Sequence, residues 1–164
     1  MDSAVQVTED QLFPSQVWHS ELVNGNELNA ELLREIADLR ATVKSVKKSN
    51  ELGWHSPTNM HKRTAFKPLC NSIHAMADVI SESMKLRTDR RLVIETFWVN
   101  VNPKHAYNAL HEHPHSVLSG VYYVQADQKS GRLRFRDPRD AKRMNPWQVD
   151  ASAQSDQRHW DRVP

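Results

Sequence analysis

The sequence has little cysteine, no long hydrophobic run and almost no net charge. Its single cysteine, Cys70, cannot form a disulfide within the chain, which fits a reducing compartment. Because Cys70 lies among Phe66, Leu69 and Ile73, we expect it to pack in the core rather than to react. A net charge of +2 gives no reason to expect capture of nucleic acid or of a membrane through the overall field.

The hydrophobic runs that do occur are short. Residues 92–94 and 121–124 are typical of them, and neither run is long enough to cross a bilayer. No basic segment followed by a hydrophobic one opens the sequence, so we expect a cytoplasmic protein. A chain of 164 residues is sufficient for one hydrophobic core. We therefore predict a single domain over residues 1–164, with a helical part in 1–90 and strands in 91–164.

Two amphipathic helices are predicted in the first part. Asn26 is the expected N-cap of the first, and hydrophobic residues then recur every three or four positions up to Val46. The second spans residues 66–84, where Phe66 begins a similar pattern. Residues 12–22 contain Pro14 and favour an edge strand or an extended lead-in.

Strands are predicted after residue 91. Residues 92–102 and 117–124 are rich in β-branched and aromatic side chains, which favour strands. In residues 132–136, arginine alternates with Leu133 and Phe135, which is typical of a strand with one solvated face. The polar residues that follow Pro138 are expected to form a long loop.

The segment most informative about function contains His111 and His113. On an extended backbone, side chains two positions apart leave the same face, so both imidazoles could reach one metal ion. Pro114 would end the strand and leave the pair at its end. A cupin-type site would place a glutamate four or five residues after the pair, but those positions are Val117 and Leu118. By itself, the spacing also allows a pair of surface histidines without a metal.

A longer pattern resembles a family of 2-oxoglutarate- and Fe(II)-dependent oxygenases found in bacteria and in phages of marine cyanobacteria. The resemblance rests on NALHEHPHSVLSGVYYV (residues 108–124), SGRLRFRDPR (130–139) and WVNVN (98–102), with LFP (12–14) and GW (53–54) nearer the N-terminus. It implies an α+β fold, in which two N-terminal helices pack on a double-stranded β-helix, the jelly-roll core that cupins share. For a phage-encoded chain, the expected location is the host cytoplasm.

The resemblance also implies the site. His111 and His113 match the first two metal ligands, although the second is a carboxylate in most members of the wider superfamily. Tyr123 matches a tyrosine that holds 2-oxoglutarate in related prolyl hydroxylases, and Asn100 and Asn102 could line the same cavity. A core position for Tyr123, and strand-end hydrogen bonds for the asparagines, are the alternatives. The expected cofactors are Fe(II) and 2-oxoglutarate, with dioxygen as cosubstrate, and the expected activity is a hydroxylase.

The resemblance further implies a distal histidine and an arginine some tens of residues beyond Arg139. The sequence ends at Pro164 without that pattern, so we expect a C-terminally truncated copy with an incomplete β-helix. His105, His115 and His159 could substitute for the third ligand, although surface positions are the simpler expectation. A catalytically silent homologue and a cupin-like metal-binding module therefore remain alternatives. An open strand edge could also pair with another chain in a homo-oligomer. The primary substrate is not indicated.

Overall fold

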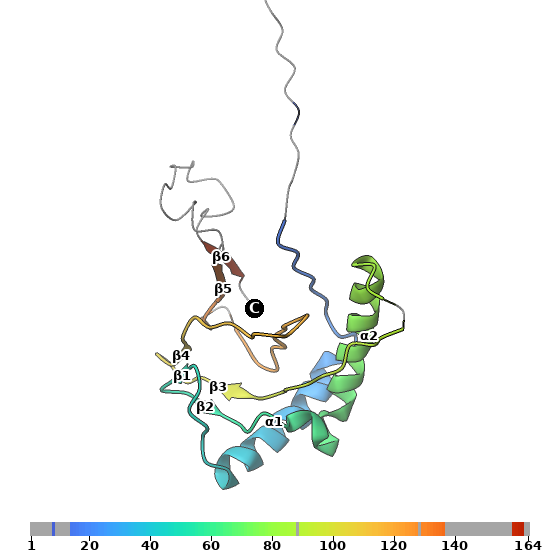
Figure 1. Ribbon diagram of the computed structural model, residues 1–164. Helices are drawn as coiled ribbons and strands as arrows, with labels where there is room; N and C mark the ends of the chain where they lie inside the picture. Colours follow the sequence, from blue (N-terminus) through green and yellow to red (C-terminus); the bar gives the residue numbers. More distant parts are fainter. Residues whose placement is uncertain (1–7, 9–13, 88, 128, 137–158, 163–164) are drawn as a thin grey trace, which may run out of the picture.

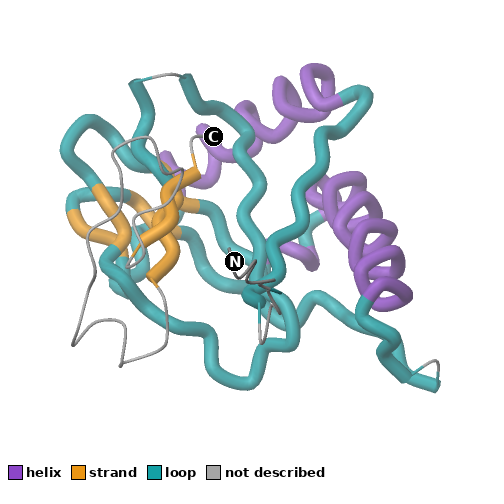
Figure 2. The backbone as a smooth tube through the Cα atoms, turned by 90° about the horizontal axis from the view of Figure 1, so that it is seen from above, coloured by secondary structure: helices purple, strands orange, loops and turns teal. Residues whose placement is uncertain are grey.

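The computed structural model describes residues 8, 14–87, 89–127, 129–136 and 159–162 (Figure 1). Its helices are α1 (Gly25–Thr42) and α2 (Lys67–Ser83), preceded in the second case by the short 3-10 helices η1 (Met60–Lys62) and η2 (Thr64–Phe66). Its strands are β1 (Asn50–Glu51), β2 (Trp54–His55), β3 (Asn100–Val101), β4 (Tyr107–Asn108), β5 (Leu133–Arg136) and β6 (His159–Arg162). Figure 2 shows that loops, rather than strands, make up most of the described chain outside the helices.

The first predicted helix is confirmed as α1, but both of its ends differ from the prediction. The N-cap is Asn24, so Asn26 lies inside the first turn. The helix ends at Thr42, and Val43 is already extended. Val46 then donates its backbone N–H to the His55 carbonyl oxygen at 2.9 Å. This contact with β2 replaces the last predicted turn, because a backbone N–H can satisfy only one strong partner.

The second predicted helix is confirmed as α2, within one residue at each end. Pro68 stands in its first turn, where a missing N–H costs no intrahelical hydrogen bond. Cys70 is buried on this helix, and burial raises the pKa of its thiol. The thiol is therefore held in its unreactive protonated form, as expected for a cysteine that serves packing.

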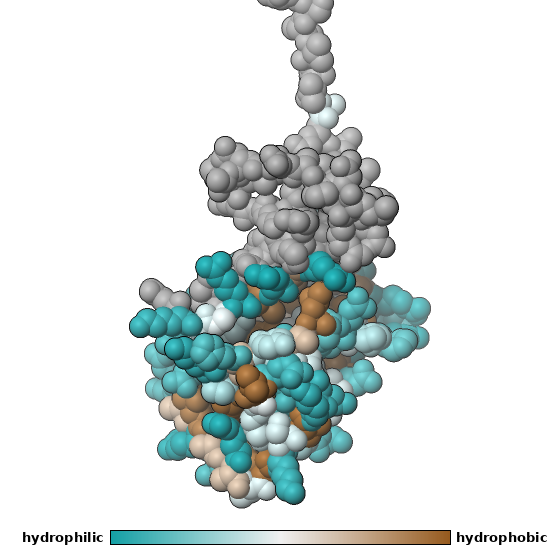
Figure 3. Space-filling view, turned by 90° about the vertical axis from the view of Figure 1, so that its left-hand side faces the viewer, coloured by the Kyte–Doolittle hydropathy of each residue, from teal (hydrophilic) through white to brown (hydrophobic). Residues whose placement is uncertain are grey.

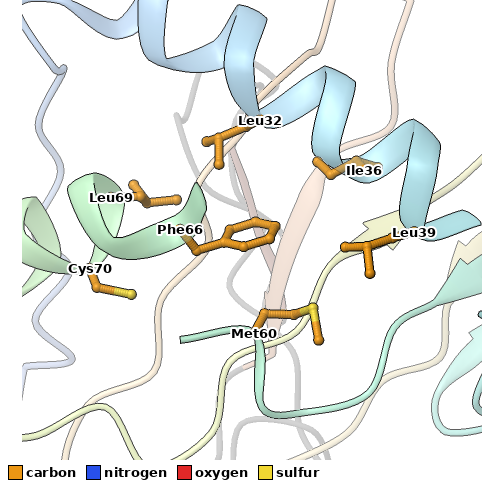
Figure 4. Close-up of a cluster of buried hydrophobic side chains, with 7 residues drawn as sticks. All are labelled: Leu32, Ile36, Leu39, Met60, Phe66, Leu69 and Cys70. Carbon is orange, nitrogen blue, oxygen red and sulfur yellow. The ribbon is translucent and has the colours of Figure 1, made fainter. Parts of the chain in front are cut away.

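The core lies where α1 meets η2 and the start of α2 (Figure 4). Phe66 is 1% exposed, and its ring is directed at the side chains of α1. Phe97 meets this ring edge-on, with 5.6 Å between ring centroids, which brings the second half of the chain onto the helical core. The buried members of the cluster are Leu32, Ile36, Leu39, Met60, Phe66, Leu69 and Cys70.

The described strands form three antiparallel pairs, namely β1 with β4, β2 with β3, and β5 with β6. Beyond the β2–β3 pair, further backbone hydrogen bonds join the same two segments, and Asn59 and Phe97 form an isolated parallel bridge. Ser56 N–H donates to the Val99 carbonyl oxygen at 3.0 Å. Phe97 N–H donates to the Thr58 carbonyl oxygen, and the Phe97 carbonyl oxygen accepts from Met60 N–H. We call this set of contacts between residues 55–60 and 97–100 the cross-ladder. It joins the helical part of the chain to the part predicted to form strands.

Two of the predicted strands are wrong or much shorter than expected. Residues 92–102 contain only β3, and residues 117–124 contain no strand. Val117 and Val121 have no strand partner among the described residues, and their side chains are 61% and 60% exposed, so their β-propensity is not used. The third predicted strand is confirmed, because β5 lies within residues 132–136. The described residues therefore do not show the predicted double-stranded β-helix.

Residues 14–22, the described part of the predicted lead-in, form neither helix nor regular strand. The loop predicted after Pro138 falls mostly on residues 137–158, which lie outside the described part of the chain. Within the described residues, neither α1 nor α2 has the length and hydrophobicity that a membrane-spanning helix requires.

Candidate metal centre

The structure brings His111 and His113 together. Their ring centroids lie 4.9 Å apart, and the ring planes are tilted by 54°. The pair was predicted to leave one face of a strand, but residues 109–119 form no strand. The closeness of the rings therefore depends on local side-chain contacts rather than on a pleated backbone.

Each imidazole is oriented by a contact at its Nδ1 atom. His111 Nδ1 lies 2.7 Å from the Ala109 carbonyl oxygen, and His113 Nδ1 lies 2.9 Å from Ser119 Oγ. Because a carbonyl oxygen only accepts, this contact of His111 favours the tautomer with the proton on Nδ1. The lone pair is then on Nε2, the arrangement found in metal-binding histidines whose other nitrogen donates to a protein oxygen.

A row of aromatic rings supports His113. Trp98 meets His113 edge-on, with 5.2 Å between ring centroids and an interplanar angle of 89°. The ring of His55 stacks almost parallel to the ring of Trp98, with 5.7 Å between ring centroids and an interplanar angle of 11°. His55 is 3% exposed, whereas His111 and His113 are exposed. The two candidate metal ligands thus lie at the surface, and the row of rings behind His113 ends at the buried His55.

The surroundings of His113 lower its pKa and so favour the neutral imidazole. Although the residue is exposed overall, its ring lies against Trp98 and Ser119, and this partial loss of water lowers the pKa of His113. Repulsion from the neighbouring His111 lowers the pKa further. A neutral imidazole is the form that binds a metal ion, so both effects favour metal binding.

The chemistry of the pair fits a divalent transition metal. Imidazole nitrogens suit iron as well as zinc, copper and nickel. Within the described part of the chain, no group of three or more His, Cys, Asp or Glu side chains has a metal-binding arrangement. His105 and His115, considered above as substitute ligands, have left-handed backbones with φ of 72° and 68°. Neither one completes such a group. His159 lies in β6, and its side chain is outside the described part.

The residues predicted to hold 2-oxoglutarate have mixed surroundings. Asn100 is exposed in β3, opposite His55. Asn102 Nδ2 donates to Asn108 Oδ1 at 2.9 Å. Tyr123 is 39% exposed, while Tyr122 donates its hydroxyl to Asn29 Oδ1 at 2.7 Å. Tyr122 packs against the hydrophobic core, whereas the binding roles of the other three residues stay predictions.

Three residues near the pair were not identified from the sequence as parts of the site. Trp98 and Ser119 belong to the sequence patterns on which the family resemblance rests, so these patterns could have identified them as candidate site residues. His55 gave no such signal, because only the cross-ladder brings it beside Trp98.

Comparison with known families supports the resemblance over the second part of the chain. Residues 96–163 match the model of the family described as "Putative 2OG-Fe(II) oxygenase", where 2OG denotes 2-oxoglutarate. The predicted resemblance to this family is therefore confirmed over that segment, which contains His111, His113 and Trp98. The bacterial or phage type and the C-terminal truncation stay predictions. No curated protein and no solved structure matches the chain.

Proposed function

We propose that this chain is a 2-oxoglutarate- and Fe(II)-dependent oxygenase of the hydroxylase type, in which His111 and His113 bind the iron. The geometry of these two residues is the observation that carries the proposal. Their rings lie 4.9 Å apart, and both Nδ1 atoms already have oxygen partners. The family match over residues 96–163 supports iron rather than another divalent metal as the ion.

Each residue of the proposed site has a defined task. When bound, Fe(II) and 2-oxoglutarate supply the activation of dioxygen that hydroxylation requires. His111 and His113 hold the metal through Nε2, while Ala109 and Ser119 keep the rings from rotating. Tyr123, Asn100 and Asn102 are proposed to bind the oxygens of 2-oxoglutarate through hydroxyl and amide donors. A third protein ligand has to come from outside this pair.

The test combines metal binding with turnover. Anaerobic calorimetry with Fe(II) measures binding, and conversion of 2-oxoglutarate to succinate in the presence of Fe(II) and dioxygen measures activity. His111→Ala and His113→Ala should each weaken Fe(II) binding by at least about tenfold, because each removes one ligand of the pair. Both variants should also abolish succinate formation.

His115→Asn is the matched control. It removes an imidazole from the same segment, and asparagine tolerates the left-handed backbone that His115 adopts. This variant should bind Fe(II) like the unmodified chain. Equal loss of binding in His115→Asn and His113→Ala would show non-specific histidine binding and would contradict the proposal.

A metal-binding module without turnover is the second candidate. The observation that favours it is the described part of the chain, where the two histidines have no third ligand beside them. This candidate predicts that Fe(II) binds with dependence on His111 and His113, while no succinate forms. A catalytically silent homologue should instead bind Fe(II) weakly or not at all and form no succinate, so the two measurements together separate the oxygenase from both.

A further inference from the structure

We propose that Trp98, backed by His55, is the positioning residue for the His113 ligand. The support for the metal centre then comes partly from residues that precede the family-matched segment 96–163. This inference rests on the proposed function, since it assigns a role at the same site. It also makes a claim about the metal-free chain that can be tested independently.

The contacts define the direction of support. His55 stacks on Trp98 with an interplanar angle of 11°, and Trp98 then meets His113 at 89°. Edge-to-face contacts of this kind are favourable and depend on orientation, because the positive edge of one ring meets the negative face of another. Rotation of the His113 ring would therefore lose both this contact and the one to Ser119 Oγ.

The support is rigid because the cross-ladder holds it. His55 is 3% exposed and Ser56 is fully buried. Ser56 N–H donates to the Val99 carbonyl oxygen, and Val99 N–H donates to Ser56 Oγ at 2.9 Å. Residues on both sides of Trp98 are thus fixed to β2 and its continuation. The indole is therefore carried on a backbone whose residues on either side are hydrogen-bonded to residues 56–60.

The backbone that carries the two histidines has no strand pairing. Residues 109–119 form no strand, and the main-chain hydrogen bond described within them runs from Ser116 N–H to the His113 carbonyl oxygen at 3.3 Å. Side-chain contacts therefore set the direction of the His113 ring. Two imidazoles bind one ion tightly only if both Nε2 atoms already point to a common position. Trp98 supplies that preorganisation for one of them.

The first experiment measures Co(II) affinity of the full chain by calorimetry, with Co(II) standing in for Fe(II) in air. Trp98→Leu should weaken binding by about two- to tenfold, the worth of one aromatic pair. Trp98→Phe keeps an aromatic ring and should restore most of the affinity. Circular dichroism confirms that each variant is folded.

Trp54→Phe is the matched control for a purely structural effect. Trp54 lies next to His55 and donates Nε1–H to the Val43 carbonyl oxygen at 3.0 Å, so its loss should lower stability. Co(II) affinity of this variant should be unchanged, because Trp54 is not one of the paired rings His55, Trp98 and His113. An equal loss of affinity in Trp54→Phe and Trp98→Leu would show that general loosening is responsible, and would overturn the proposal.

The second experiment needs no metal. In the proton–carbon spectrum of the metal-free chain, the His113 ring signals should carry a ring-current shift from Trp98. Trp98→Leu should remove this shift, and Trp54→Phe should preserve it. If the unmodified chain binds no Co(II) or Fe(II), the proposed function fails, while the ring shift still decides whether Trp98 positions His113. An unchanged His113 signal in Trp98→Leu would overturn the positioning role.

Discussion

The helical part of the molecule and the histidine-bearing segment differ in how they are held. In α1 and α2, every turn is closed by hydrogen bonds within the helix, and a shared hydrophobic cluster covers one face of each. Residues 117–124 have the sequence of a strand, yet residues 109–124 form no strand, and several of their large side chains are exposed. Brown hydrophobic patches among the hydrophilic residues are visible on the face in Figure 3.

The contrast shows that side-chain contacts can help to hold a segment that has no strand pairing. The helices need only neighbours three or four residues away, whereas a strand needs a partner from elsewhere in the chain. Where that partner is missing among the described elements, the rings of Trp98, His111 and His113 still form a defined cluster.

The largest expected difference is in amide hydrogen exchange. Leu32 and Ile36 are buried in α1, so their amides should exchange only on global unfolding. Val117 and Val121 lie in no ladder and should exchange faster, by on the order of 10³-fold or more. Exchange measured by mass spectrometry or NMR checks this. Equal protection of both regions would mean that residues 117–124 pair as strands in solution.

Phe66→Ala should cause the largest loss of stability among single substitutions. The ring is 1% exposed between the helices, and its removal leaves a cavity, at a cost of about 3–5 kcal/mol. Urea denaturation followed by circular dichroism measures the change. Val79→Ala, on the same helix α2 but 68% exposed, is the control and should change stability by less than about 0.5 kcal/mol. Similar losses for both would place Phe66 outside the core.

Tyr122→Phe should have a moderate effect. The hydroxyl donates to Asn29 Oδ1 at 2.7 Å and connects the histidine-bearing segment to α1. Loss of this hydrogen bond should lower the free energy of unfolding by about 0.5–1.5 kcal/mol. Tyr107→Phe, at a site 57% exposed, should be nearly neutral in the same denaturation assay. A neutral Tyr122→Phe would show that the two regions are not connected through this contact.

The smallest expected effect concerns pH. The pKa of His113 lies below its ordinary value of 6.5, so the folded chain binds fewer protons there than the unfolded chain. The free energy of unfolding should therefore decrease as the pH falls through the range below 6.5, and be unaffected by this group well above it. NMR titration of His113 in the folded and urea-unfolded chain checks the sign. In His111→Ala, the pKa of His113 should rise, because the repulsion between the rings is removed.

The sequence predicted the local features of this molecule better than its long-range ones. The spacing of Leu32, Ile36 and Leu39 predicted α1, and the run that begins at Phe66 predicted α2, because both patterns act over a few residues. The strand predicted over 117–124 failed, since β-propensity describes a preference for a partner that has to come from elsewhere.

For the site, the outcome was similar. The two-residue spacing of His111 and His113 predicted their proximity, even though the expected strand is absent there. The stacking of His55 on Trp98 could not be predicted, because 43 residues separate the two positions in sequence and only the folded cross-ladder joins them.

The cross-ladder has a consequence for dividing the protein. It connects residues 55–60 to 97–100 across the boundary at which the family match begins. A polypeptide of residues 96–163 alone would lose the partner of β3, the stacking partner of Trp98 and the ring that faces Phe97. Two polypeptides produced by division near residue 90 should instead reassociate when mixed, as in fragment complementation. Each of them carries one of the two segments that the cross-ladder joins.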